Sequence, residues 1–171
     1  SGVLRTNLGA IEPAISRDGR FVVFNSPTDV RWPFYRGSWS DGVITWGNIF
    51  CMDLLTETVG QVNEARALGN APAVSHDGRW VAYLNQRSEL ELWDMVERTN
   101  RVIGTWDGTG YGYPKTVFSP DGRWLAINGN FAIDGTYSGG LQLHSLVSNR
   151  TVSVIISPQG EALDYLHGAV F

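Results

Sequence analysis

Short apolar runs alternate with polar turns along the whole chain, and three of these runs follow nearly the same phrase. The phrase S-x-D-G-R begins at Ser16, Ser75 and Ser119, and it continues as FVVF, WVAY and WLAI. A short run that is apolar at successive positions is typical of a strand buried on both faces. We therefore expect a buried strand after each phrase.

The phrase itself predicts a tight turn. Asp and Ser side chains hydrogen-bond the turn backbone, and Gly adopts a positive φ without steric cost. A short strand precedes each phrase, so the turn is expected to join two antiparallel strands. The residues expected to shape these turns are Asp18, Gly19, Asp77, Gly78, Asp121 and Gly122.

A second hairpin is predicted downstream of each buried strand. The aligned segments are NIFCMDLLTETVGQV, LELWDMVERTNRVIG and LQLHSLVSNRTVSVI, with turns expected at 56–57, 98–100 and 148–149. Asp53, Asp94 and Ser145 stand at equivalent places before these turns. We interpret them as turn-shaping groups rather than catalytic acids.

These copies define a repeat of four strands, A to D. The second and third phrases begin 44 residues apart, which is within the ~40–45 residues of a four-stranded propeller blade. The first interval is 59 residues, which predicts an insertion at 28–47. The sequence thus predicts one all-β domain over 1–171, a β-propeller of four-stranded antiparallel blades. Its parts are an outer strand of a preceding blade at 1–10, full blades at 11–66, 67–108 and 109–156, and a loop with the inner strand of a next blade at 157–171.

The phrase P-x-x-S-x-D-G-R with the hairpin that follows it resembles the WD-repeat-like blades of TolB-type β-propellers. It is also similar to the blades of tricorn protease propellers and of the propellers attached to prolyl-oligopeptidase-type peptidases. The resemblance covers almost the whole chain and implies the propeller fold. It also implies a bacterial, extracytoplasmic protein, so we expect a periplasmic or extracellular location. It does not define the function, because propellers host many activities.

Three blades are too few for a closed ring, because propellers contain about four to eight. A second copy would bring an A strand of one chain to a D strand of the other and leave out the two strands between them. We therefore expect a portion of a longer propeller rather than a self-sufficient dimer. The end strands VLRTNL and AVF need cover from more chain or from a neighbour.

One face of the predicted blades carries all of the long connections. Because the strands alternate in direction, the B–C and D–A connections lie on one face, and the short A–B and C–D turns lie on the other. The long connections are rich in aromatic residues and Gly, and binding residues favour loops on a rigid scaffold. The candidate binding residues are Trp32, Phe34, Tyr35, Trp39, Trp46, Tyr111, Tyr113 and Tyr137.

Three interpretations of this loop face stay open. The insertion can fold on itself, with its aromatic side chains in a small satellite core. Tyr, Trp and Arg also favour interfaces with a protein partner, and flat aromatic rings suit a glycan. We expect a non-catalytic scaffold that mediates protein–protein interaction or assembly. The alternatives are the propeller portion of a larger enzyme with a peptidase-type gating role, and a carbohydrate-binding propeller.

The net charge and the cysteine content narrow the possible functions and binding partners further. The net charge of −4 argues against binding to nucleic acid and to an anionic membrane surface. No apolar run approaches the ~18 residues of a spanning helix. The single cysteine, Cys51, excludes an internal disulfide, and its apolar surroundings favour a buried side chain over a reactive thiol.

The sequence carries no motif for catalysis, a metal or a cofactor. The nucleophile elbow G-x-S-x-G is absent, so the chain is not expected to be an enzyme. The three histidines show no zinc-ligand spacing. His76 occupies a turn position where the other copies have Arg17 and Pro120, which indicates an exposed site. His144 is expected to pack in a strand, and only His167 belongs to the loop face.

An arginine follows each turn glycine, at Arg20, Arg79 and Arg123. A guanidinium group that recurs once per blade is most simply structural. We expect it to bridge to a neighbouring blade or to stack on an aromatic ring.

Overall fold

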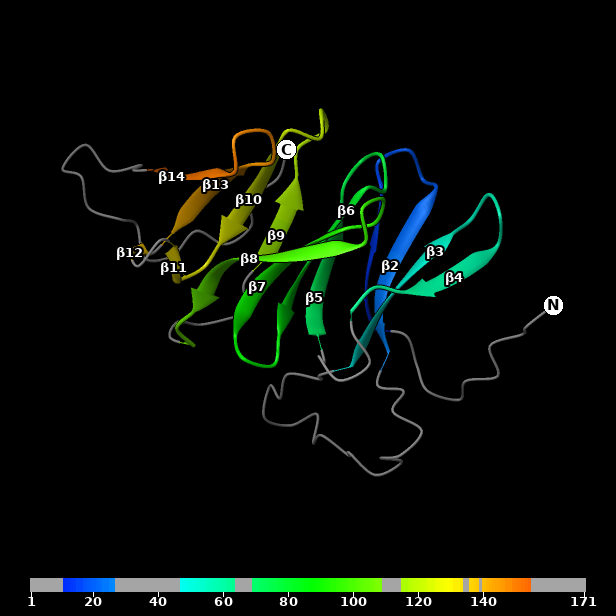
Figure 1. Cartoon of the computed structure of the whole chain (residues 1–171), viewed down its shortest axis with the longest axis horizontal. Helices are drawn as coiled ribbons and strands as arrows, with labels where there is room; N and C mark the ends of the chain where they lie inside the picture. The colour runs from blue at the N-terminus through cyan, green and yellow to red at the C-terminus, as the bar shows by residue number, and fades with distance from the viewer. Residues whose placement is uncertain are drawn as a thin grey trace, which may run out of the picture.

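The computed structural model describes residues 11–26, 47–63, 69–108, 115–133, 136–138 and 140–154. The regular structure within these ranges is β-structure, arranged as three antiparallel sheets. Figure 1 shows the sheets side by side like the leaves of a fan, coloured blue to cyan, green, and yellow to orange. The fold class predicted from the repeat is confirmed.

Each repeat forms one sheet in which its A–B hairpin pairs with its C–D hairpin. The strands of the first sheet, in spatial order, are β1 (Ile11–Ile15), β2 (Phe21–Ser26), β3 (Asn48–Asp53) and β4 (Thr58–Gln61). Those of the second are β5 (Gly69–Val74), β6 (Trp80–Asn85), β7 (Glu89–Asp94) and β8 (Thr99–Trp106). Those of the third are β9 (Lys115–Phe118), β10 (Trp124–Asn128), β13 (Leu141–Ser145) and β14 (Arg150–Val154).

The connection between β10 and β13 differs from the expected loop. Two short strands, β11 (Phe131–Ile133) and β12 (Thr136–Ser138), form a hairpin there. β11 pairs with the end of β8, so this hairpin extends the second sheet instead of the third. The interpretation of this connection as a loop was wrong, because β8 offers an unpaired edge that only the folded arrangement brings next to it.

The sheet order gives each central strand two apolar faces. Val81 and Tyr83 of β6 pack in the core toward the first sheet, whereas Ala82 and Leu84 pack in the core toward the third. Successive side chains of a strand point to opposite faces, so a strand wedged between two sheets needs apolar residues at every position. This is the physical reason for the continuous apolar run WVAYL after the second turn.

The three A strands, β1, β5 and β9, lie next to one another at the inner edge of the fan. The short A–B and C–D turns lie at one end of the sheets, which we call the turn end. The opposite end, where β2, β4 and β8 finish and β3, β5 and β9 begin, is called the loop end. This arrangement brings the inner strands and the turns of all three repeats together.

Candidate functional site

The A–B turns are built by one repeated set of hydrogen bonds. In the first turn, the Ser16 hydroxyl donates to Oδ1 of Asp18 (2.5 Å), and Oδ1 also accepts from the backbone N–H of Arg20 (3.0 Å). The backbone N–H of Phe21 donates to Ser16 Oγ at 2.8 Å. Gly19 completes the turn with φ of 72°. The Ser and Asp side chains therefore satisfy the turn backbone.

The second and third turns repeat this geometry. Ser75 donates to Asp77 at 2.6 Å, and Ser119 donates to Asp121 at 2.5 Å. The turn glycines have φ of 70° at Gly78 and 67° at Gly122. The three repeats therefore end their inner strands with turns of the same hydrogen-bonded geometry.

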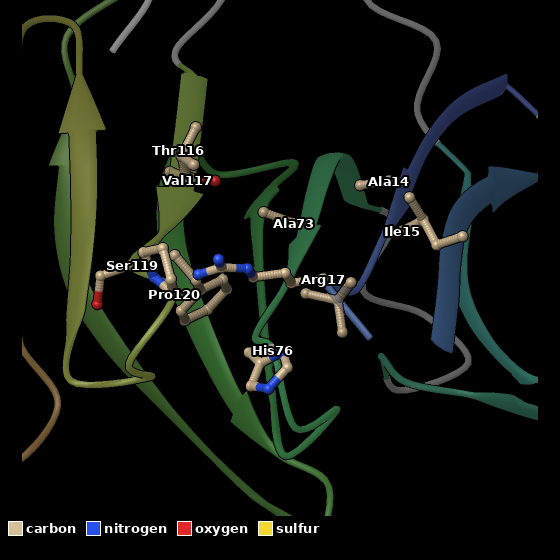
Figure 2. A pocket seen from close by; sticks show the side chains of 11 residues that line it. Ala14, Ile15, Arg17, Ala73, His76, Thr116, Val117, Ser119 and Pro120 are labelled. Carbon is tan, nitrogen blue, oxygen red and sulfur yellow. The ribbon is translucent and has the colours of Figure 1, made fainter. Parts of the chain in front are cut away.

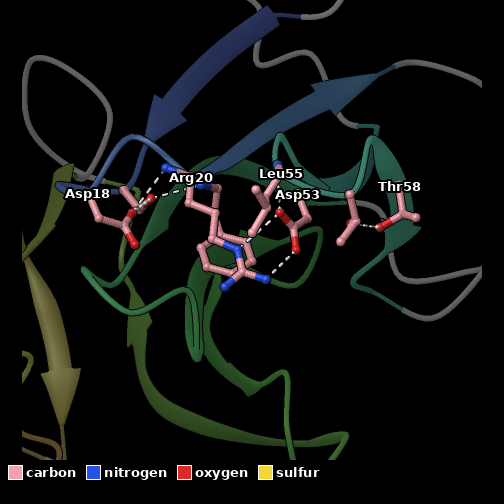
Figure 3. Close-up of polar contacts among 8 residues, drawn as sticks. Asp18, Arg20, Asp53, Leu55 and Thr58 are labelled. Atoms are coloured by element: carbon pink, nitrogen blue, oxygen red, sulfur yellow. Dashed lines mark hydrogen bonds and ion pairs between the residues drawn. The ribbon is translucent and has the colours of Figure 1, made fainter.

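The arginine after each turn glycine is held within its own sheet. Arg20 Nη2 lies 2.7 Å from Asp53 Oδ2, and its Nε donates to Oδ1 at 3.1 Å (Figure 3). Arg79 makes the equivalent pair with Asp94 at 2.7 Å. Both guanidinium groups also stack over the ring of the next residue, Phe21 or Trp80. The expectation of stacking is confirmed for Arg20 and Arg79, and their ion-pair partners belong to the same sheet and not to a neighbouring one.

The third sheet lacks this ion pair. Trp124 pairs in register with Ser145, at the place where Trp80 pairs with Asp94. Ser145 keeps only the turn-shaping role, and its hydroxyl accepts from the N–H of Ser148 at 3.1 Å. Among the described residues, Arg123 has no ion-pair partner.

The electrostatics of the turn end follow from these contacts. The hydrogen bond from Arg20 lowers the pKa of Asp53 to about 2. The hydroxyl of Ser16 lowers the pKa of Asp18, and the hydroxyl of Ser119 lowers that of Asp121. These carboxylates are therefore charged acceptors near neutral pH and unsuited to donate a proton.

A hollow of about 540 Å³ lies between the three inner strands at the turn end. We call it the inner hollow. Residues of β1, β5, β9 and their turns line it: Ala14, Ile15, Arg17, Ala73, Val74, His76, Thr116, Val117, Phe118, Ser119 and Pro120. Figure 2 shows Arg17 extending from the side of β1 across the hollow toward Pro120, with His76 at the same end.

The variable position of the repeated phrase faces this hollow. Arg17, His76 and Pro120 are the x residues of the three S-x-D-G-R copies, and all three line it. Reading His76 as an exposed turn residue is confirmed by its solvent exposure. The sequence did not reveal that this position lines the hollow between the three inner strands. The signal was present, since x is the one residue that changes within a constant turn.

The loop end is held by a backbone bridge between the first and second sheets and by a side-chain hydrogen bond within the first. Gly47 and Gly69 exchange two hydrogen bonds, of 3.1 and 2.7 Å. A Cβ at Gly47 would lie 2.6 Å from the backbone oxygen of Ser26, so only glycine fits there. Asn63 accepts from the N–H of Ile49 at 2.8 Å. These contacts fix both the start of β3, where the 28–47 insertion ends, and the end of the first sheet.

The predicted binding residues fall almost entirely outside the described ranges. This holds for Trp32, Phe34, Tyr35, Trp39, Trp46, Tyr111 and Tyr113. Tyr137 belongs to β12, where its backbone pairs with Ala132. The structure thus brings Tyr137 to the edge of the second sheet, and the binding role of the whole set stays a prediction.

A buried carboxylate between β6 and β7 is satisfied by its neighbours. Glu91 accepts from the Tyr83 hydroxyl (2.5 Å), from Asn85 Nδ2 (2.6 Å) and from Asn100 Nδ2 (2.9 Å). The equivalent cross-strand pairs are Phe24 with Phe50 and Ile127 with Gln142. One position of the repeat is thus filled in three chemically different ways, and in the second sheet the buried carboxylate is held by three hydrogen bonds.

The remaining reactive side chains are packed. Burial raises the pKa of the Cys51 thiol to about 11, and His144 is buried with its Nδ1 2.9 Å from Thr151 Oγ1. In the described ranges, no cluster of His, Cys, Asp and Glu could hold a metal ion. The same ranges contain no helix long and apolar enough to cross a membrane.

Solved structures with the same fold are numerous, although no protein-family model and no curated protein matches the sequence. The tricorn protease is 15% identical with a TM-score of 0.57, and the match covers 86% of this chain and 13% of that one. TolB from Acinetobacter baumannii is 16% identical with a TM-score of 0.51, over 85% and 32%. Oligogalacturonate lyase from Vibrio parahaemolyticus is 16% identical with a TM-score of 0.53, over 85% and 40%.

These likenesses show the fold, which is that of TolB-like and peptidase β-propeller regions. The chain spans less than half the length of each of these structures. At such identities the shared architecture does not carry over an activity.

Proposed function

We propose that this chain is a non-catalytic β-propeller scaffold that binds a protein partner through its loop end. The observation that carries the proposal is the rigid anchoring of that end. The Gly47–Gly69 bridge ties the end of the 28–47 connection to the second sheet, and the Asn63 hydrogen bond ties the end of the first sheet to β3. Loops that carry binding residues need a scaffold of this kind, because fixed bases reduce the entropy lost on binding.

The composition of the connections supports a protein partner. The segment 28–47 contains three Trp, one Phe and one Tyr, together with Arg31 and Arg36. Trp, Tyr and Arg dominate the energetics of protein interfaces, since each combines a large apolar area with a polar group. The partner is expected to present an apolar patch with acidic residues at its rim.

Site-specific photo-crosslinking tests this proposal. A photoreactive phenylalanine analogue at Trp39 should form an adduct with one protein in extracts of the source cells. The same analogue at Val147, an exposed residue of a turn-end hairpin, serves as the control and should not form that adduct. Replacing Trp32 and Trp46 by Ala should abolish the adduct. Equal adducts from both positions, or none from Trp39, would contradict the proposal.

The propeller portion of a larger enzyme is the second candidate. It is favoured by the tricorn protease match, in which a chain like this one corresponds to 13% of a protease. The mass and the full sequence of the native gene product distinguish this candidate from the first. A mass well above 18.9 kDa, with a hydrolase-like segment in the added sequence, would favour this candidate over the first.

Glycan binding is a third candidate, since an oligogalacturonate lyase shares the fold. A glycan array distinguishes glycan binding from the proposed binding of a protein partner. Binding to a sugar that is lost when Trp32, Trp39 and Trp46 are changed to Ala would favour it, and an array without signal would exclude the sugars tested.

A further inference from the structure

The inner hollow has the size and lining of a small-molecule site. Its volume of about 540 Å³ falls within the ~300–1,000 Å³ typical of ligand pockets. Its walls are mostly apolar and come from all three inner strands, with Ile15, Val74 and Phe118 among them. Ile15 is 60% exposed, so a large apolar side chain faces the open space. Covering such a surface with an apolar group is favourable.

The ionisable side chains that line the hollow are basic, and the carboxylate of Asp18, beside Arg17, interacts electrostatically with His76. Arg17 and His76 are its ionisable lining residues, and no carboxylate is among the lining residues. The neighbouring carboxylates of Asp18 and Asp77 bond to their own turns, through Ser16 and Ser75 and through the backbone. Within the described ranges neither Arg17 nor His76 forms an ion pair. A guanidinium group beside an imidazole is well suited to hold an anionic group.

We propose that the inner hollow binds a small organic anion with an apolar body. Its carboxylate or sulfonate would contact Arg17 and His76, while its body would lie against Ile15 and Phe118. The hollow lies at the turn end, and the protein partner of the proposed function would lie at the loop end. The inference therefore stands or falls independently of that function.

Two fluorescent probes that differ only in charge test the proposal on the full chain. 8-Anilinonaphthalene-1-sulfonate is an anion, and N-phenyl-1-naphthylamine has the same aromatic body without the sulfonate. The wild-type chain should bind the anionic probe more tightly. The variants Arg17→Ala and His76→Ala should each raise its Kd by about threefold to tenfold, and leave the Kd of the neutral probe unchanged.

Two further variants locate the site. Arg87→Ala removes an exposed arginine from the β6–β7 turn at the loop end, and it should leave both Kd values unchanged. Ile15→Glu places a carboxylate in the hollow, so it should weaken the anionic probe more than the neutral one. Circular dichroism and thermal unfolding check that each variant is folded. Equal binding of the two probes by the wild type, or equal effects of Arg17→Ala and Arg87→Ala, would overturn the proposal.

Discussion

The two cores between the sheets use equivalent positions of the repeat but different side chains. The core between the second and third sheets contains Leu90, Leu92 and Ile127, and the hairpin residue Phe131 adds to it. The core between the first and second sheets contains Val23, Val62 and Cys51 together with the larger Ile49 and Tyr83. The same backbone frame thus accepts two different packings.

The difference goes together with how each pair of sheets is linked. The third repeat sends β11 to pair with β8, so a strand of that repeat belongs to the second sheet. The first sheet is linked through the Gly47–Gly69 bridge, and through the Glu12 carboxylate, which accepts from the N–H of Ala71 at 2.9 Å. Backbone hydrogen bonds therefore contribute to both contacts between sheets, and the contact between the second and third sheets also buries the ring of Phe131.

The largest effect is expected when the crossing hairpin loses its buried ring. Phe131 is fully buried, so Phe131→Ala should lower the free energy of unfolding by about 3–5 kcal/mol. Leu55 is 75% exposed, and Leu55→Ala is the control, with an expected change below about 0.5 kcal/mol. Urea denaturation monitored by fluorescence measures both. A loss below about 1 kcal/mol for Phe131→Ala would show that the hairpin does not stabilise the contact between the sheets.

A matched pair of truncations compares the two cores directly. Leu92 and Cys51 each lie two residues before the aspartate that pairs with the turn arginine, so they are equivalent. Leu92→Ala should cost about 2–5 kcal/mol and Cys51→Ala about 1 kcal/mol, because the leucine loses more buried carbon. Urea denaturation of both variants measures the two changes in the free energy of unfolding. Equal losses would mean that the core between the first and second sheets is the more tightly packed one.

Alanine substitutions at two turn glycines distinguish the cost of local backbone strain from the cost of a clash between sheets. At Gly122 an added Cβ meets nothing within 4 Å, so Gly122→Ala should cost about 1–2 kcal/mol from the positive φ alone. At Gly78 the Cβ would lie 2.1 Å from Cδ2 of Phe21 on the first sheet. Gly78→Ala should therefore cost about 1–3 kcal/mol more. Differential scanning calorimetry should show the lower Tm for Gly78→Ala, and equal Tm values would contradict the contact.

Acid should weaken the first sheet through Asp53. Its folded-state pKa of about 2 lies below the ordinary value of 3.8. The unfolded state therefore takes up a proton first, and the stabilisation present above about pH 4 is lost as the pH falls toward 2. Asp53→Asn should flatten this part of the stability profile. Unfolding curves at pH 5, 4, 3 and 2 measure it, and the same slope in wild type and variant would exclude Asp53 as the cause.

The smallest effect is expected from giving the third sheet the missing ion pair. Ser145→Asp places a carboxylate opposite Trp124, the residue after Arg123, just as Asp94 lies opposite Trp80 and pairs with Arg79. The gain at pH 7 should be below about 1 kcal/mol, because the pair is near the surface. Ser145→Asn is the isosteric control without charge, and thermal unfolding compares the two. A higher Tm for the asparagine variant would show that the pair does not form.

Much of the scaffold could be predicted because its determinants are local. The Ser16–Asp18–Gly19 contacts and their two copies involve residues at most five apart, so the phrase specifies the turn. The apolar run at 80–84 specifies a strand with two buried faces. The candidate site could be predicted from the sequence only in part. The second position of the S-x-D-G-R phrase varies between the copies, but the sequence does not show that Arg17 and His76 line the same hollow.

The sequence by itself determined the repeat, the turns, the four-stranded units and the packed roles of Cys51 and His144. These features follow from side chains that act on their own or adjacent backbone, or from apolar periodicity, and both can be read along the chain. Only the tertiary structure decided that β11 joins the second sheet, that Arg20 pairs with Asp53, and that the variable turn residues converge. Each of these depends on which edges and ends the folded sheets bring together. Arg20 and Asp53 are 33 positions apart, and they meet because strand register places Asp53 opposite Phe21, the residue after Arg20.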